Sequence, residues 1–470
     1  MQLKKNTIQK IGLIGADIIS LTVAFLLAIW LTQRYHLDLF NSPWSNFFHF
    51  GVSKLLGLLI IAIFWYAEQY TKRRPFWEEL LQTYRIIGLL IVINLGLSFV
   101  MGKSSLKVLI VGFWVSFAVV LPLIRICAKL LMSNFNIWQR SLYIIGTGTT
   151  AKEAYELFAL NTLMGYRIKK FVTTNSSVVD LDLPAGVVHI DELLELVKAD
   201  SECEIIVALS YQELNNQMKM INYLQHNCMY LSVLPEITGL ALYGAHIDHF
   251  FGNDHLILRL NNNLARPFNA FLKRVFDLIL VVVGLIILSP AFLIIAFIIK
   301  LTTRDKVFFF HKRVGKHGKP FYCIKFQTMY PNSSELLAKL LENSPDARLE
   351  WEKDFKLKND PRVTTIGKFL RKTSLDELPQ LFNVLRGEMS LVGPRPIIDR
   401  EIERYEDGYY YYQLVLPGIT GLWQVSGRNV VDYKNRVRLD EWYVKNWSLW
   451  YDIVIIIKTF GVVLKRTGAY

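Results

Sequence analysis

The feature that most constrains the fold is the apolar run LILVVVGLIILSPAFLIIAFIIK at residues 278–300. As a straight helix it would extend about 35 Å, which is enough to cross the ~30 Å hydrocarbon core of a membrane. Lys273 and Arg274 precede the run and Lys300 ends it, so positive charge stands at both ends. Because membrane spans keep most of their positive charge on the cytoplasmic side, this pattern disfavours a simple crossing.

The dipeptide Ser289-Pro290 interrupts the run near its middle. Pro290 has no N–H to offer the carbonyl of Ile286, and the neighbouring Ser289 hydroxyl is a suitable replacement donor. A break here predicts two legs of roughly 16 and 15 Å, each about half a membrane. A helix that enters and returns leaves both ends in the cytoplasm, so the charges favour a re-entrant helix over its alternative, a kinked span.

Earlier in the chain, four apolar runs have the length and composition of transmembrane helices; they lie at residues 11–32, 55–67, 86–101 and 108–124. Basic residues precede the first run and follow the second, whereas residues 36–51 contain no Lys or Arg. The positive-inside rule therefore places the amino terminus and the second connection in the cytoplasm. A domain of four transmembrane helices is predicted over residues 1–134, in agreement with a hydrophobic fraction of 52%.

Alternating strand and helix patterns, beginning with SLYIIG and AKEAYELFAL, predict a Rossmann-like α/β domain over residues 135–260. Gly146 and Gly148 open the sequence GTGTTA, which matches a dinucleotide-binding turn. The second strand, however, ends in TTN and provides no acidic residue for a ribose. We therefore expect no NAD, and a domain that is non-catalytic and acts in assembly or regulation.

Charge and cysteine content narrow the function classes. A formal net charge of +13 points to acidic partners, and the high apolar content favours phosphorylated substrates and lipid headgroups over nucleic acid. The four cysteines form no C-x-x-C pair, which argues against a zinc site or a disulfide framework and fits a reducing cytoplasm.

Residues suited to phosphate chemistry concentrate at positions 370–396, LRKTSLDELPQLFNVLRGEMSLVGPRP. The adjacent Asp376 and Glu377 have a structural explanation, since Ser374 to Glu377 spell a helix capping box. Pro379 favours a helix that begins near itself instead, which would leave both carboxylates at the positive end of that helix. An ionised Asp there suits a nucleophile or a metal ligand.

Two arginines flank this carboxylate pair. Arg371 precedes Asp376, and Arg395 stands between two prolines that fix its backbone. Guanidinium groups bind phosphate oxygens with two parallel hydrogen bonds, and together with a divalent ion they offset the repulsion between a carboxylate and a phosphate. Each arginine alone is equally well explained as a surface ion pair, but the set favours phosphoryl transfer.

Several longer motifs resemble one known family. They are KRVFD ahead of the Ser-Pro-interrupted run, then NDPRVT, RKTSLDELPQL, GEMSLVGPRP and PGITGLWQVSGR. Together they resemble the bacterial sugar transferases that act on polyprenyl phosphates, the monotopic phosphoglycosyl transferases. The resemblance is dense from residue 273 to 470 and, with four spans and an α/β domain in front, extends to the long form of the family.

The resemblance implies a multidomain membrane protein. After the four-helix transmembrane bundle and the Rossmann-like domain, an α+β catalytic domain is expected over residues 261–470. It would contain the re-entrant helix 278–300 and interfacial amphipathic helices. The end of the chain fits the last expectation, because Trp447, Trp450 and Tyr451 lead into an apolar segment followed by cations; a buried terminal helix is the alternative.

The resemblance also implies a reaction. Asp376 would attack the β-phosphate of a UDP-sugar, release UMP and hold a covalent sugar-phosphate that undecaprenyl phosphate then accepts. The sugar is expected to be galactose, because WYVKNWSLWYDI is most similar to members that transfer galactose-1-phosphate, with glucose as the alternative. This would be the first membrane step of O-antigen, capsule or exopolysaccharide synthesis.

The family pattern assigns further roles. Glu377, with Asp376, would hold Mg²⁺. The expected substrate contacts are Arg371, Arg395, Lys273, Arg274, Lys325 and Arg428. Gln327 departs from the family pattern KFRTM, where an arginine is usual. The implied setting is the bacterial inner membrane, with membrane lipids as surroundings, the catalytic and α/β domains in the cytoplasm, and a homodimer as the assembly.

Two other classes compete with this interpretation. A nucleotide-sugar dehydratase or epimerase would use the α/β domain and a Tyr-x-x-x-Lys pair after it, and neither Tyr211 nor Tyr223 is followed by Lys at that spacing. A non-enzymatic membrane scaffold would make the Asp376–Glu377 region purely structural. Replacement of Asp376 by Asn separates the enzyme from the scaffold.

Overall fold

The computed structural model describes residues 5–34, 43–101, 104–174, 183–199, 203–237, 239–249, 252, 256–260, 263–264, 266–344, 348, 360–427 and 432–465. The chain forms two compact units, Met1–Ile237 and Thr238–Tyr470. This boundary precedes the one expected after residue 260. The hairpin of β6 (His246–His249) and β7 (Leu256–Arg259) therefore belongs to the second unit and not to the α/β domain.

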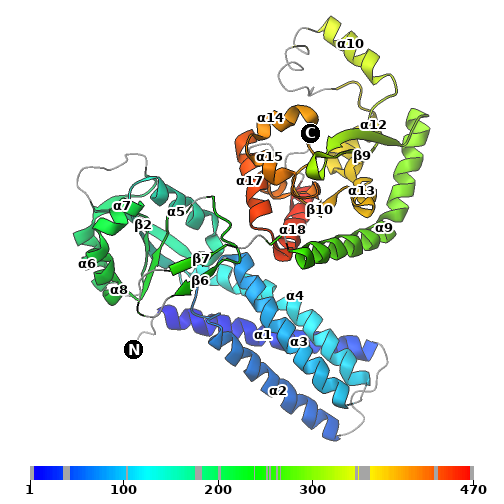
Figure 1. Ribbon diagram of the computed structural model, residues 1–470. Helices are drawn as coiled ribbons and strands as arrows, with labels where there is room; N and C mark the ends of the chain where they lie inside the picture. Colours follow the sequence, from blue (N-terminus) through cyan, green and yellow to red (C-terminus); the bar gives the residue numbers. More distant parts are fainter. Residues whose placement is uncertain are drawn as a thin grey trace. The chain divides into compact units, whose positions relative to one another are not determined.

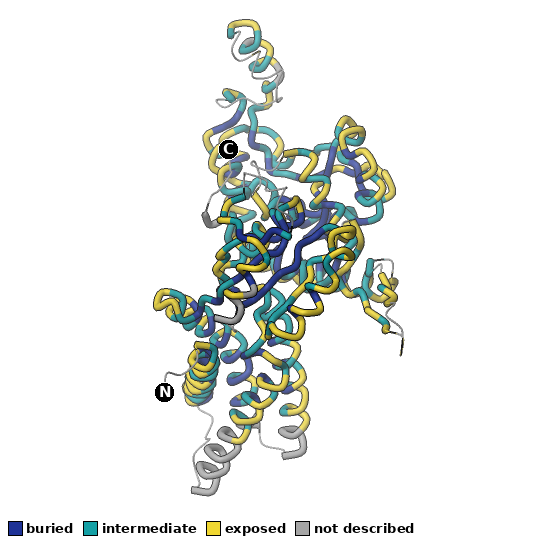
Figure 2. The backbone as a smooth tube through the Cα atoms, turned by 90° about the vertical axis from the view of Figure 1, so that its left-hand side faces the viewer, coloured by how far each residue is buried: buried dark blue, intermediate teal, exposed yellow. Residues whose placement is uncertain are grey.

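The first unit opens with four long helices that match the four predicted apolar runs (Figure 1): α1 (Lys5–Arg34), α2 (Pro43–Tyr66), α3 (Phe76–Met101) and α4 (Ser104–Asn134). Within the described residues, α1, α3 and α4 are apolar over a length sufficient to cross a membrane, whereas the apolar stretch of α2, Leu55–Tyr66, is shorter. Figure 2 shows buried positions alternating with exposed ones along these helices. Their exposed positions include large apolar residues such as Leu26 and Leu58, as expected for helices that face lipid.

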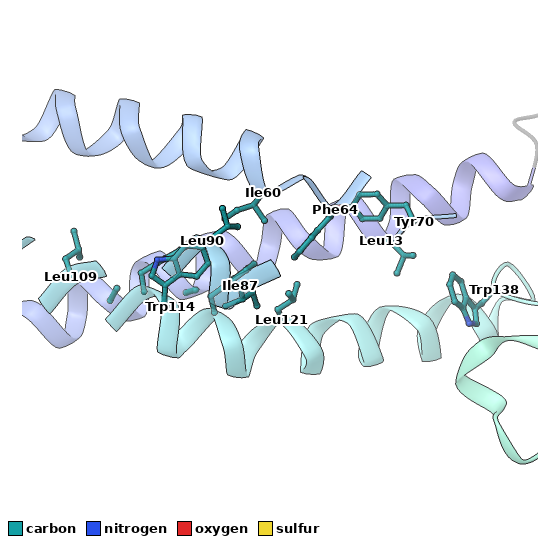
Figure 3. Packing of buried hydrophobic residues seen from close by; sticks show 14 residues of the cluster. Leu13, Ile60, Phe64, Tyr70, Ile87, Leu90, Leu109, Trp114, Leu121 and Trp138 are labelled. Atoms are coloured by element: carbon teal, nitrogen blue, oxygen red, sulfur yellow. The ribbon is translucent and has the colours of Figure 1, made fainter. Parts of the chain in front are cut away.

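The bundle core is apolar, and an ion pair lies buried beside it. Side chains from all four helices, among them Leu13, Ile60, Leu90 and Trp114, meet in one cluster (Figure 3). Arg125 on α4 binds both carboxylate oxygens of the fully buried Asp17 on α1, each at 2.7 Å. The hydroxyl of Tyr70 donates a third hydrogen bond to Asp17 at 2.6 Å, so the buried charge is paired and hydrogen-bonded.

The α/β domain of the first unit has the predicted alternating order. Its elements are β1 (Arg140–Ile145), α5 (Thr149–Leu160), β2 (Tyr166–Thr173), β3 (Val187–His189), α6 (Ile190–Ala199), β4 (Glu204–Val207), α7 (Tyr211–Asn216), α8 (Met218–Asn227) and β5 (Tyr230–Val233). The strands form one parallel sheet in the order β3-β2-β1-β4-β5. Separate apolar cores join its two faces to α5 and to α6 and α8, which makes the sheet doubly wound.

The glycine turn after β1 is required by the backbone. Gly146 has a φ of +131°, and a Cβ there would lie 2.2 Å from the carbonyl oxygen of Ala208 on the neighbouring segment. Gly148 immediately precedes α5. Close packing between strand and turn therefore accounts for Gly146 without a nucleotide, and Asn175, the end of the TTN sequence, lies outside the described residues.

The second unit is an α+β domain. Its longer elements are α9 (Pro267–Thr303), β8 (Phe308–Val314), β9 (Pro320–Phe326), α10 (Ser333–Asn343), α12 (Thr365–Thr373), α13 (Gln380–Arg386), α17 (Tyr433–Lys445) and α18 (Leu449–Lys465). Strands β8 and β9 form the expected antiparallel hairpin. A second, parallel pair joins β10 (Ser390–Val392) to β11 (Gly418–Thr420). Helix α13 packs on both α9 and β9 through Leu381 and Val384.

Helix α9 contains the long apolar run of residues 278–300. It is one continuous helix with Pro290 inside it, and its ribbon turns partway along (Figure 1). The hydroxyl of Ser289 donates to the carbonyl of Ile286 at 2.8 Å, which confirms the predicted replacement donor. The expected break is therefore a bend within a single helix, because the serine satisfies the carbonyl that proline cannot.

The terminal helix α18 is amphipathic. Val454 and Ile455 are buried against the domain, while Ile457 and Phe460 are 49% and 66% exposed. The expected apolar outer face is present. The prediction for Trp447 was wrong: this residue is only 2% exposed, and its indole N–H donates to the carboxylate of Asp452 at 3.1 Å.

Helix α17 contains a buried carboxyl group that predicts a pH effect. Asp440 is 2% exposed; one oxygen accepts from the Tyr405 hydroxyl at 2.8 Å, and the other has no hydrogen-bond partner among the described residues. Burial raises the pKa of Asp440 from 3.8 to about 7. The folded state thus keeps a proton that the unfolded chain releases between these values, so stability falls as pH rises through that range, by at most about 1.4 kcal/mol per pH unit.

Replacing Asp440 with Asn removes this titration and is expected to flatten that part of the stability profile. Denaturant unfolding of the native protein and of Asp440→Asn between pH 5 and pH 8 provides the measurement. The Tyr405 contact is available to both, because the amide oxygen of Asn is also an acceptor. Parallel profiles for the two proteins would contradict the assignment.

Candidate active site

The two carboxylates lie in the short turn η3 (Leu375–Glu377) between α12 and α13. Ser374 has a φ of +57° and ends α12, so the capping box considered at Ser374 is wrong. Pro379 instead precedes the first residue of α13, as the alternative interpretation predicted. The left-handed serine reverses the chain after α12, and this reversal places Asp376 and Glu377 ahead of α13.

A cleft of about 260 Å³ opens beside this turn. It is lined by Arg313, Cys323, Lys325, Glu377, Gln380, Arg395, Pro396, Ile419 and Gln424. Within this lining three residues are cationic and one is a carboxylate, so the cleft favours an anion that contains several oxygen acceptors.

Electrostatics couple the turn to strand β9. The ammonium of Lys325 lies 2.6 Å from a carboxylate oxygen of Glu377, and both side chains are about four-fifths buried. Burial and, second, the negative charge of Glu377 raise the pKa of Asp376 to about 6, while the charges of Lys325 and Arg371 lower it. Asp376 therefore remains mainly ionised at neutral pH.

The flanking arginines occupy different surroundings. Arg371 lies in the last turn of α12, and its guanidinium donates a hydrogen bond to the Thr328 hydroxyl at 3.0 Å. The positive charge of Arg371 lowers the pKa of Asp376. Arg395 is exposed at the mouth of the cleft, on the segment that follows β10. Arg371 and Arg395 thus lie on different elements around the same carboxylate pair.

Sequence reasoning missed Arg313 at the end of β8. Its guanidinium donates to the carbonyl of Pro396 at 3.0 Å, and burial together with the charge of Arg395 lowers its pKa. Glu401, whose carboxylate lies 3.9 Å from the Arg313 guanidinium, offsets part of the repulsion between Arg313 and Arg395, and a bound anion would offset more of it. The available signal was the sequence RVG beside a glycine-rich turn, but it is a short pattern.

Gln424 belongs to the motif GLWQVSGR. It lies on α16 (Leu422–Val425), and its amide oxygen is buried with no hydrogen-bond partner in the described structure. Its amide nitrogen makes one long contact, 3.5 Å, to the carbonyl of Ile419. An acceptor of this kind is costly unless a ligand donates to it.

Lys273 and Arg274 do not line the cleft. Lys273 is 9% exposed, and its ammonium lies 2.7 Å from the buried carboxylate of Asp452. Arg274 donates to the carbonyls of Val384 and Leu385 at the end of α13, at 2.6 and 3.1 Å. Both side chains therefore connect α9 to the rest of the domain, in contrast to the substrate contacts expected for them.

The sequence also singled out Gln327, as a departure from the family pattern, and Arg428, as a substrate contact. Gln327 donates to the carbonyl of Met329 at 3.1 Å and is absent from the cleft lining. Arg428 lies outside the described residues.

Sequence similarity to known proteins shows the family of this chain. Residues 268–466 match the family model described as bacterial sugar transferase. Over 99% of its length the chain is 40% identical to the UDP-galactose-lipid carrier transferase of Erwinia amylovora, 98% of which is covered. The chain belongs to the bacterial sugar transferase family. The resemblance found in the sequence is confirmed.

Other relatives agree. The transferase is 43% identical to the undecaprenyl-phosphate galactose phosphotransferase of Salmonella typhimurium, over 88% of the chain and 87% of that protein. It is 48% identical to the exopolysaccharide production protein ExoY of Rhizobium meliloti, over 44% of the chain and 91% of that protein. The similarity to the first two relatives includes the transmembrane and α/β parts of this transferase.

Proposed function

We propose that the protein transfers galactose-1-phosphate from UDP-galactose to undecaprenyl phosphate. The names of the two relatives that match most of the chain support both substrates. The observation that carries the proposal is the carboxylate pair Asp376–Glu377 beside a cleft that contains Arg313, Lys325 and Arg395. A sugar nucleotide contains a diphosphate, and guanidinium and ammonium groups such as these bind phosphate oxygens.

The proposed chemistry has two displacements. A carboxylate oxygen of Asp376 forms a bond to the β-phosphorus of the donor, and the bond from that phosphorus to the bridging oxygen breaks, so UMP leaves with the oxygen and its electron pair. A phosphate oxygen of undecaprenyl phosphate then attacks the same phosphorus and releases the Asp376 carboxylate. The product is a lipid diphosphate sugar, the first membrane intermediate of a surface polysaccharide.

The cations of the cleft stabilise the charge that develops on the transferred phosphoryl group. Arg313 and Arg395 are proposed to contact the diphosphate, and Lys325 to hold Glu377 in place and to contact the donor. Arg371 keeps Asp376 ionised through its charge. Arg428 retains the substrate contact that the family pattern assigns to it.

The residues of η3 suit Mg²⁺. Among the described residues no three His, Cys, Asp or Glu side chains converge, so the protein alone does not form a closed metal site. Mg²⁺ is commonly held by one or two carboxylates together with substrate phosphates and water, and Asp376 and Glu377 provide that number. When bound, the ion would neutralise phosphate charge.

We further propose that α9 is a re-entrant helix in the cytoplasmic leaflet of the bacterial inner membrane. Ile286 and Leu293 near the bend are 69% and 73% exposed, and basic residues stand at both ends of the helix. Cysteines introduced at Phe268 and Asp305 should then be labelled from the same, cytoplasmic side. Labelling from opposite sides would establish a complete crossing.

The test of the function is UMP release by the purified full-length protein. We expect release from UDP-galactose that requires undecaprenyl phosphate for turnover, exceeds release from UDP-glucose, and stops when EDTA removes divalent ions. A preference for UDP-glucose would support the same reaction with glucose-1-phosphate as the transferred group. No release from any UDP-sugar would favour the non-enzymatic scaffold.

Gln424 provides a further prediction. Its unpaired amide oxygen needs a donor, and the sugar hydroxyls and the uracil N–H of UDP-galactose are donors. Replacement of Gln424 by Leu is expected to lower kcat/KM for UDP-galactose by about 10- to 100-fold, the cost of one lost hydrogen bond in a buried site. Steady-state rates of UMP release at several UDP-galactose concentrations give this kcat/KM. Gln327→Leu is the matched control, since Gln327 does not line the cleft, and an equal loss in both variants would contradict a specific role for Gln424.

A further inference from the structure

A second cleft, of about 370 Å³, lies in the first unit, outside the catalytic domain. It is bounded by the start of α1, the connection between α2 and α3, the end of α4 and the start of β1. Trp138, which follows the end of α4 (Figure 3), forms part of the wall. We call it the basic cleft, because five of its described lining residues are cationic (Lys72, Arg73, Arg74, Lys129 and Arg140) and one, Glu79, is a carboxylate.

Three of the five cations have carboxylate partners. Lys129 pairs with Glu79. Lys72 lies 2.5 Å from Glu68, in an exposed pair. Arg140 lies 3.2 Å from Glu204. The positive charge of the basic cleft that remains comes from the other two residues, Arg73 and Arg74.

Among the described residues, Arg73 donates hydrogen bonds only to neutral acceptors. It donates to the carbonyls of Met164, Gly165 and Trp138 at 2.6, 2.7 and 2.8 Å, and to the side-chain oxygen of Gln9 at 3.0 Å. These contacts fix the guanidinium but do not compensate its charge. Burial, and secondly the charge of Arg140, lower its pKa to about 10.

Arg74 has no ion pair and no hydrogen bond within the part of the chain that the structure describes, and it is only partly exposed. Among the described residues neither Arg73 nor Arg74 forms an ion pair, because the one carboxylate of the lining, Glu79, is paired with Lys129. An anion of the phosphate type would compensate the charges of both arginines.

The position of the cleft along the helices indicates which anion. Trp65 and Tyr66 end α2 and are 54% and 89% exposed, as aromatic residues are at a membrane–water boundary. The connection with Lys72, Arg73 and Arg74 follows directly. On α1, Gln9 lines the cleft, and the exposed Ile11 begins the apolar outer face. The basic cleft is therefore at the depth of lipid headgroups, not deep in the cytoplasm.

We propose that the basic cleft binds the phosphate group of an anionic phospholipid of the cytoplasmic leaflet. Arg74 and Lys72 contact the phosphate, and Arg73 supplies fixed positive charge behind them. The apolar walls formed by Leu13, Leu163 and Trp138 suit the start of the glycerol and acyl portion. The lipid would link α1, α4 and the α/β domain, which meet at this cleft.

The test uses the full-length protein in neutral detergent. Native mass spectrometry measures binding of short-chain phosphatidylglycerol, phosphatidylcholine and inorganic phosphate. We expect phosphatidylglycerol to bind at least about 10-fold more tightly than phosphatidylcholine. The variant Lys72→Gln/Arg74→Gln should lose at least about 10-fold in affinity for phosphatidylglycerol, while UMP release stays unchanged because neither residue belongs to the catalytic machinery.

Lys169→Gln is the matched control, since Lys169 is an exposed cation on β2 that does not line the cleft. Arg74→Gln alone guards against misfolding, because among the described residues this side chain forms no ion pair or hydrogen bond that its loss would break. Equal affinity for the two lipids, or equal loss in Lys169→Gln, would overturn the proposal. Inorganic phosphate that displaces phosphatidylglycerol at equal concentration would also overturn it and assign a soluble anion.

Discussion

Replacing Asp376 with Asn is expected to abolish turnover, lowering kcat for UMP release by at least about 10³-fold. Asn has nearly the same shape but no carboxylate, so it cannot form the proposed bond to phosphorus. Because burial and Glu377 disfavour the charge of Asp376, the neutral variant should be at least as stable as the native protein. Loss of activity would therefore not reflect loss of fold.

Trapping the covalent intermediate makes this test specific. Native protein incubated with donor labelled in the sugar and without lipid acceptor should retain label after denaturation, and Asp376→Asn should retain none. Glu377→Gln, which loses its ion pair with Lys325, is the control: it should slow the reaction and still form the adduct. Label retained by Asp376→Asn would identify a different nucleophile.

The parts of the fold that sequence predicted are those set by local pattern. Apolar length predicted the helices of the bundle, and strand–helix alternation predicted the parallel sheet, because each signal lies within one element. At the site, the conflict between Ser374 and Pro379 was resolved correctly by the rigid ring of Pro379. These inferences needed no knowledge of distant contacts.

The sequence does not predict pairings between residues far apart in the chain. Lys273 was assigned to substrate because a basic residue near a phosphate site is a reasonable ligand, but its partner Asp452 is 179 positions away. The unpaired oxygen of Gln424 and the cleft position of Arg313 likewise arise only when the hairpin, η3 and α16 come together. Periodicity contains no information about such pairings.

Replacing Lys273 with Met is expected to lower the free energy of unfolding strongly. Asp452 is fully buried and accepts from three groups: Lys273 at 2.7 Å, the Tyr443 hydroxyl at 2.7 Å and the Trp447 indole at 3.1 Å. Lys273→Met would leave this carboxylate buried without its cation. Removing one partner of a buried pair typically costs about 3 to 5 kcal/mol, so the free energy of unfolding of the second unit should fall by that amount. Denaturant unfolding of the purified protein measures it.

A double replacement separates the buried pair from a role in substrate binding. Lys273→Met combined with Asp452→Leu removes both charges, and much of the lost stability should return because no buried charge is left unpaired. Under conditions where all variants are folded, KM for UDP-galactose should stay near the native value. A raised KM in Lys273→Met with unchanged stability would restore the substrate contact that the sequence predicted. The expected result would instead show that the Lys273–Asp452 ion pair holds α9 against α18. Lys273 also donates to the carbonyl of Val392 at 3.1 Å, which connects α9 to the strand that precedes Arg395.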